Sequence, residues 1–208
     1  MKTILIALTL VYSSLAMTAQ TIDLFNGSDL NNWEFALKDA DKNPSEVFSV
    51  KNQMIHIAGP FGYMYSKEKF SNFHLYVEWR WPIEASNSGI FLYMQNTEQV
   101  WPDAVECQLQ AGNAGDMLLL NAQSGLTKLM NYEGQDASGR LKKMANSSEL
   151  PVGEWNNAHI ICNEGTITIF INGILQNRGK VSYKSGNIAI QSEGKDMQVR
   201  KIRLTPLF

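Results

Sequence analysis

The chain has 208 residues, of which 44% are hydrophobic and 18% are charged. This length suits a single domain with a sizeable core. The 18 basic side chains nearly balance the 20 acidic ones, for a net charge of −2, and no basic block or stripe occurs in the sequence. The charge pattern therefore argues against nucleic acid or an anionic lipid surface as the partner.

The first 19 residues have the pattern of a secretory signal peptide. Lys2 precedes an apolar run from Ile4 to Tyr12, and small residues follow up to Ala19. The run is too short to span a bilayer, and we expect cleavage after Ala19, with Ala16 as the alternative. No cysteine follows either position to carry a lipid, so no membrane anchor is expected. Residues 20–208 are then expected to form one periplasmic or secreted domain.

Alternating apolar and polar residues predict a series of strands along the mature chain. The clearest alternation is in Phe73–Trp81, and Asn172-Gly173 is the strongest hairpin-turn signal. Met117–Leu120 fits either a strand or a turn of helix, and residues 131–151 are expected to form a long loop. The remaining expected strands are a hairpin at Phe48–Ile57 and single strands at Ile90–Met94, Val105–Gln110, Ala158–Cys162, Thr166–Ile171, Gly186–Gln191 and Met197–Leu204.

These strands are separated by turn residues, and no long amphipathic helix follows the leader. The pattern predicts an all-β sandwich or barrel of antiparallel strands. Cys107 and Cys162 are the only cysteines, and both occur in strand-like apolar contexts. Export permits a disulfide, but a core of this size does not require one, so we expect two buried free thiols.

The most informative stretch is Trp101–Asp116, WPDAVECQLQAGNAGD. Its alternation places Glu106 and Gln108 on one face of a strand, roughly 7 Å apart. A carboxyl group beside an amide on a rigid strand suits the binding of hydroxyl-bearing ligands or the transfer of a proton. The alternative is an ordinary solvated strand face.

Other polar and aromatic residues extend this set. Arg80 shares a strand face with Glu78, and these two residues can equally well pair with each other. Carboxylate, amide and aromatic groups together are typical of carbohydrate recognition, although composition alone does not separate a lectin from an enzyme. Besides Glu106 and Gln108, the candidate residues are Asn87, Ser88, Gln191, Glu193, Trp101 and Arg80.

Several kinds of chemistry have no motif in this chain. There is no nucleotide-binding glycine loop, no GxSxG nucleophile elbow, and no HExxH or CxxC metal motif. The three histidines, His56, His74 and His159, are far apart in the sequence, and their spacing does not suggest a metal site.

Six segments carry a family resemblance over nearly the whole mature chain: LFNGSDLNNW, NSGIFLYM (Asn87–Met94), VWPDAVECQLQAGNAGD, PVGEWN (Pro151–Asn156), INGILQN and IAIQSEG (Ile188–Gly194). They resemble the family of 3-keto-disaccharide hydrolase domains. The resemblance implies a concanavalin A-like jelly-roll sandwich of two antiparallel sheets. It also implies a carbohydrate partner and cleavage of a glycosidic bond in a sugar oxidised at C3.

In such a sugar the C3 ketone acidifies the C2 proton, so that a general base can remove it and the group at C1 can leave. Ordinary glycosidases instead place two carboxyl groups across an oxocarbenium-like centre. The resemblance implies that Glu106 acts as general base or metal ligand. Gln108, Asn87 and Ser88 would contact the substrate, with Gln191 and Glu193 closing the cleft.

Glu193 is expected to be a second catalytic residue, and a divalent metal ion is the one cofactor the family suggests. Some family members carry a histidine where this chain has Glu193, so metal binding stays open here. The alternative function is a non-catalytic, lectin-like carbohydrate-binding module.

Overall fold

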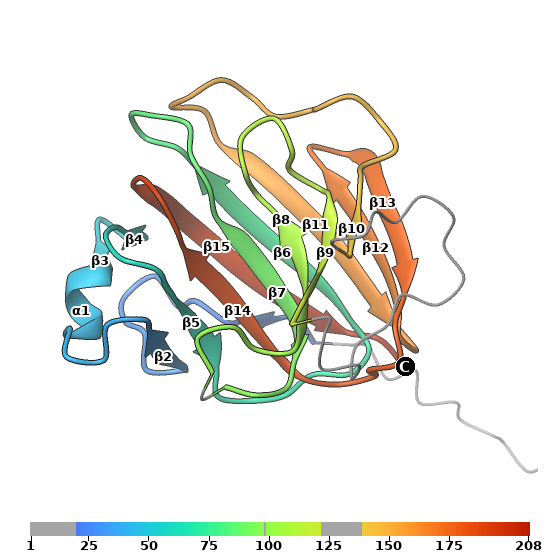
Figure 1. Cartoon of the computed structure of the whole chain (residues 1–208), viewed down its shortest axis with the longest axis horizontal. Coiled ribbons are helices and arrows are strands. Elements are labelled where there is room, and N and C mark those ends of the chain that lie inside the picture. Colours follow the sequence, from blue (N-terminus) through green and yellow to red (C-terminus); the bar gives the residue numbers. More distant parts are fainter. Residues whose placement is uncertain (1–19, 98, 122–138) are drawn as a thin grey trace, which may run out of the picture.

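The computed structural model describes residues 20–97, 99–121 and 139–208, whose strands form two antiparallel sheets packed face to face (Figure 1). The predicted all-β sandwich of two antiparallel sheets is therefore confirmed. The expected signal peptide and residues 131–138 of the expected loop lie outside the described residues. Within the described ranges, no helix has the length and apolar character needed to cross a membrane.

The first sheet has eight strands in the order β13-β12-β11-β6-β15-β4-β3, with β1 paired to β15. Its centre is the long pair formed by β6 and β15, which matches the clear alternation seen in the sequence. The strands are β1 (Ile22–Asp23), β3 (Phe48–Lys51), β4 (Met54–Ile57), β6 (Phe73–Arg80), β11 (Asn156–Asn163), β12 (Thr166–Ile171), β13 (Ile174–Lys180) and β15 (Met197–Pro206).

The second sheet has seven strands in the order β10-β9-β8-β7-β14-β5-β2. Its central strands β7 and β8 are consecutive in the sequence, whereas β14 on the other side of β7 comes from near the C-terminus, so the sheet brings distant segments side by side. The strands are β2 (Trp33–Leu37), β5 (Gly62–Ser66), β7 (Gly89–Met94), β8 (Ala104–Gln108), β9 (Met117–Leu120), β10 (Arg140–Leu141) and β14 (Asn187–Ser192).

Two tight turns confirm the hairpins expected from the sequence. Asn52 and Gln53 have φ angles of 52° and 57° between β3 and β4, and Asn172 and Gly173 have φ angles of 49° and 79° between β12 and β13. Two consecutive positive φ angles match the twist of the flanking strands, and asparagine and glycine adopt them most readily.

The main core fills the space between the sheets. Cys107 and Cys162 are fully buried in it as free thiols, as the sequence predicts. Near the start of the described chain, the buried side chains of Phe25 and Trp33 anchor the backbone to the core. The Trp33 Nε1 atom donates a 2.9 Å hydrogen bond to the Leu24 carbonyl oxygen. The inward-facing residues include Leu75, Val77, Trp79, Ile90, Leu92, Val105, Ile160, Ile169, Ile190 and Ile202.

The structure decides one open alternative and adds two short elements. Of the two alternatives expected for Met117–Leu120, the structure has the strand. The expected 131–151 loop contains β10, because Arg140 and Leu141 pair with β9. A four-residue helix, α1 (Pro44–Val47), precedes β3, with Pro44 in its first turn and the Asn43 side chain accepting from the Ser45 backbone N–H. These elements are too short to produce a periodic sequence pattern.

Candidate functional site

The candidate site lies on the outer face of the seven-stranded sheet, away from the main core. Val105 and Cys107 pack into that core, so Glu106 between them points to the opposite face. Phe91, the ladder partner of Glu106, belongs to a separate apolar cluster on this outer face. The predicted polar front of the strand is confirmed, but it is not solvated, because Glu106 is 3% exposed and Gln108 is 6% exposed.

The strand register gathers further polar residues beside Glu106. Gly89 of β7 lies between Gln108 of β8 and Gln191 of β14. Beyond this row, an isolated bridge joins Asn87 to Glu193. Five predicted site residues from three distant segments therefore occupy neighbouring positions on one face.

Gly89 makes room for the Glu106 side chain. A Cβ atom at Gly89 would lie 2.2 Å from Glu106 Oε1 and 2.8 Å from its Cδ atom. These distances are far below van der Waals contact, so the carboxyl group of Glu106 lies directly over the Gly89 backbone. The glycine of NSGIFLYM is thus required by this close approach.

Three oxygen atoms near this position are buried and have no hydrogen-bond partner among the described residues. They are Asn87 Oδ1, Glu106 Oε1 and Gln191 Oε1. Leaving such an acceptor unpaired costs about 1–3 kcal/mol, so buried acceptors are normally satisfied. Because the three lie close together on this face, they are available to hydrogen-bond donors of a ligand, such as the hydroxyl groups of a sugar.

The two carboxyl groups of the site have different protonation behaviour. Burial raises the pKa of Glu106 to about 8, the negative charge of Glu193 adds to the rise, and the positive charge of Arg140 opposes it. Burial also raises the pKa of Glu193, against a hydrogen bond from Gln191. Glu193 is only partly buried. Near neutral pH the Glu106 carboxyl therefore keeps its proton and can donate it.

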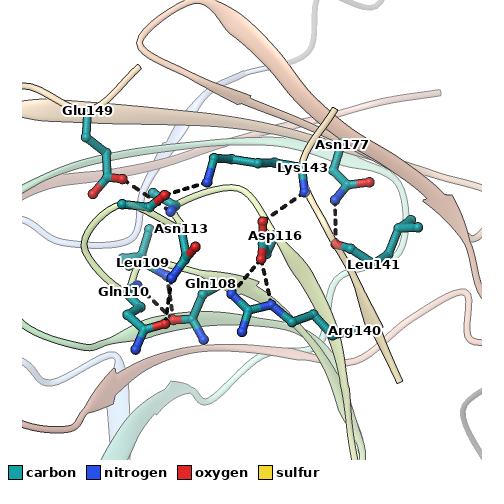
Figure 2. Close-up of polar contacts among 12 residues, drawn as sticks. Gln108, Leu109, Gln110, Asn113, Asp116, Arg140, Leu141, Lys143, Glu149 and Asn177 are labelled. Atoms are coloured by element: carbon teal, nitrogen blue, oxygen red, sulfur yellow. Dashed lines mark hydrogen bonds and ion pairs between the residues drawn. The ribbon is translucent and has the colours of Figure 1, made fainter. Parts of the chain in front are cut away.

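The side-chain amide oxygen of Gln108 stabilises the backbone turn that follows β8 (Figure 2). Its Oε1 atom accepts hydrogen bonds from the backbone N–H of Leu109 at 2.9 Å and of Gln110 at 2.8 Å. The Nε2 atom remains as its donor. Gln108 thus fixes the turn and still offers one donor on the face that carries Glu106.

Asp116 and Arg140 belong to the site's surroundings, and the residue-by-residue reading of the sequence did not single them out. Asp116, which is 2% exposed, accepts from Arg140 at 2.6 Å and from the Lys143 backbone N–H at 2.8 Å (Figure 2). This pair fixes β10 beside β9 and positions the charge that acts on Glu106. Asp116 ends the GNAGD motif, which is a signal for it, whereas no local pattern marks Arg140.

An aromatic pair lies near one end of this face. Trp101, in the loop before β8, is 50% exposed, and its ring centroid is 4.3 Å from that of Phe61. The same loop is tied to the sheet, because the Tyr63 hydroxyl lies 3.0 Å from the Thr97 carbonyl oxygen and 2.6 Å from that of Gln99. An exposed aromatic surface beside polar groups suits stacking on a sugar ring.

Comparison with protein-family models shows to which family the chain belongs. Residues 20–205 match the family described as "3-keto-alpha-glucoside-1,2-lyase-like domain". The chain belongs to this family. A search of curated protein sequences gives no match.

Solved structures with this fold include carbohydrate-active proteins. A candidate glycosyl hydrolase from Parabacteroides distasonis ATCC 8503 is 18% identical, with a TM-score of 0.66, over 90% of this chain and 100% of that one. A Bacillus licheniformis β-glucanase is 12% identical, with a TM-score of 0.56, over 92% and 100%. Carbohydrate-binding module CBM66 from Bacillus subtilis is 7% identical, with a TM-score of 0.54, over 83% and 94%. At these identities the likeness establishes the fold.

Two residues expected to contact substrate lie elsewhere or are already engaged. Arg80 is on β6 of the other sheet, where it lies over the Trp155 ring and donates to Gln198, so the structure does not bring it to Glu106. Ser88 is buried, and its hydroxyl donates to the Gln191 backbone carbonyl at 2.9 Å. Ser88 therefore ties the start of β7 to β14, and its hydroxyl is already engaged there.

The divalent metal suggested by the family stays a prediction. Among the described residues, no three His, Cys, Asp or Glu side chains are close enough to share a metal ion.

Proposed function

We propose that this chain is an exported enzyme that cleaves the glycosidic bond of a 3-keto-glucoside or 3-keto-disaccharide. The observation that carries the proposal is the buried Glu106 carboxyl, raised in pKa to about 8 and adjoining unpaired acceptors on Asn87 and Gln191. Family membership supports a carbohydrate substrate. The pair of carboxyl groups with different environments supports acid–base chemistry.

The raised pKa of Glu106 makes it the proton donor, in place of the general base or metal ligand that the resemblance implied. Glu193 is the more exposed carboxyl, and it acts as the base that takes the proton from C2 of the keto sugar. The electron pair forms an enolate with the C3 oxygen, for which Gln108 Nε2 is the available donor. When the C3 ketone reforms, C1 and C2 become doubly bonded and the bond from C1 to the leaving oxygen breaks. Protonated Glu106 gives its proton to that oxygen.

The cycle closes by proton exchange. Glu106 ends the step as a carboxylate and Glu193 as an acid, and exchange with solvent restores both. Addition of water across the new double bond at C1 and C2 converts the elimination product into the hydrolysis product. The Asn87 and Gln191 oxygens accept hydrogen bonds from sugar hydroxyls throughout, and Trp101 stacks on a neighbouring ring.

The test is turnover of 3-keto-glucosides by the wild-type protein, Glu106→Gln and Glu193→Gln. Loss of a true acid or base lowers kcat by about 100-fold or more. Glu46→Gln is the matched control, because Glu46 is exposed on α1 and belongs to neither sheet. Equal turnover by wild type and Glu106→Gln would remove Glu106 from the chemistry. Calorimetric binding of glycans without any turnover would instead establish the lectin-like alternative.

A further inference from the structure

A second group of polar and ionisable side chains lies on the outer face of the eight-stranded sheet, on the opposite side of the sandwich from Glu106. The ladders place Tyr76 of β6 between His159 of β11 and Arg203 of β15. Next to this row, His74 is paired with Thr205. These outward-facing residues line a shallow depression of about 460 Å³.

The two histidines are in direct contact inside this depression. His74 Nε2 lies 2.9 Å from His159 Nδ1, and the rings stack with centroids 5.1 Å apart and planes 12° apart. The Tyr76 ring is 4.7 Å from that of His159. One ring nitrogen must donate to the other, so protonation of both rings removes the acceptor of this hydrogen bond and places two positive charges side by side. A negative charge against the pair is what makes that state favourable.

The lining of the depression consists of hydrogen-bond donors and cations. Lys201 and Arg203 line it, and none of the described lining residues carries a carboxyl group. Asp23 of β1 contacts Arg203 through Nε at 2.7 Å, which leaves the two Nη groups of Arg203 for a ligand. Glu78 of β6 contacts Lys201 Nζ at 3.1 Å.

The charge balance around the depression is positive before the histidines are counted. Glu78 is also the partner of Arg200 and accepts from the Tyr76 hydroxyl. Three cations, Arg200, Lys201 and Arg203, thus face two carboxylates, Glu78 and Asp23. An entering cation would meet this excess positive charge, whereas an anion is attracted by it.

We propose that this depression binds the oxyanion group of a small acidic ligand, a carboxylate or a sulfate, between the His74–His159 pair and the side chains of Lys201 and Arg203. The site is separate from the proposed catalytic face, and its existence does not depend on that function. A uronic or sulfated sugar and a free inorganic oxyanion present the same chemistry, and the experiment distinguishes them.

Binding is coupled to protonation of the histidine pair. Burial lowers the pKa of both histidines, and the proximity of His159 lowers that of His74 further. The pair is therefore neutral at pH 7, and the oxyanion binds more tightly as the pH falls. A ligand at ten times the dissociation constant of the protonated site raises the apparent pKa of the pair by about one pH unit.

The experiment follows the C2–H resonances of the histidines by NMR between pH 4.5 and 8. Sodium sulfate is added stepwise, with sodium chloride at equal ionic strength as its control. Glucuronate is added in the same way, with neutral glucose as its control. We expect saturable shifts of His74 and His159 with sulfate and a raised apparent pKa, while His56, on β4 outside the depression, is unaffected. Shifts with glucuronate and not glucose assign the site to acidic sugars, and shifts with sulfate alone assign it to an inorganic oxyanion.

A charge-removing variant completes the test. Arg203→Gln should weaken the oxyanion at least about tenfold, and Arg178→Gln, at an exposed position on β13, should leave it unchanged. The proposal is overturned if no saturable shift occurs with either oxyanion, if His56 responds like the pair, or if Arg203→Gln binds as wild type does. None of these results bears on turnover by Glu106.

Discussion

Replacing Glu106 by glutamine tests whether the fold keeps this carboxyl group neutral. Burial raises its pKa from 4.5 to about 8. A carboxyl group that binds its proton more tightly when folded stabilises the folded state below its unfolded pKa, and this contribution is lost as the pH rises through its folded pKa. For a rise from 4.5 to about 8, the loss amounts to about 5 kcal/mol.

Glutamine has the shape of the neutral acid and does not ionise. Wild type and Glu106→Gln should therefore unfold with similar free energies at pH 5, whereas at pH 9 the variant should be more stable by up to about 5 kcal/mol. Urea-induced unfolding, followed by tryptophan fluorescence at both pH values, measures the difference, with Glu46→Gln as the control. A variant that is less stable than wild type at pH 9, or equally stabilised at both pH values, would refute the reasoning.

Two further substitutions test the packing around this carboxyl. Gly89→Ala places a methyl group 2.2 Å from Glu106 Oε1 and must displace it, so kcat on a 3-keto-glucoside should fall at least about tenfold while the unfolding free energy falls by about 1–3 kcal/mol; an unchanged kcat would contradict this position of the carboxyl. Asp116→Ala leaves the Arg140 guanidinium without its buried partner and should cost about 3 kcal/mol in urea unfolding. Asp41→Ala, in an exposed loop, is its control and should cost almost nothing, and equal losses in the two variants would show that the Asp116–Arg140 pair is unimportant.

The main strands could be predicted from the sequence because each one is long enough to show its own period. Phe73–Arg80 alternates through eight residues, and the buried and exposed positions follow that alternation except at Glu78. Glu78 is buried because cations from β15 surround it. By contrast, β10 has two residues and exists only because Arg140 pairs with Leu118 of β9. A pairing between distant segments leaves no period in either of them.

The same distinction explains which site residues could be predicted. Glu106 and Gln108 share a face because they are two residues apart on one strand, which is a local property. Their proximity to Gln191 depends on β7 lying between β8 and β14, which the sequence alone does not reveal. Arg80 also lies on an alternating strand, but that strand belongs to the other sheet. Alternation in the sequence indicates which residues share a face of one strand. The order of the strands in the sheet decides which residues of other strands lie beside them.

The two outer faces of the sandwich have opposite hydrogen-bonding character. The net charge of the chain therefore does not decide whether one face can bind an acidic ligand. Near Glu106 the unpaired buried groups are oxygen acceptors, whereas His74, Lys201 and Arg203 present donors on the far side. The net charge of −2 averages over both faces. The cations come from one short stretch of β15, Arg200-Lys201-Ile202-Arg203, and the ladder sets His74 of β6 and His159 of β11 beside them. A nearly neutral chain can therefore still carry a site for an acidic ligand, because a short cationic stretch joins polar groups of neighbouring strands on one face.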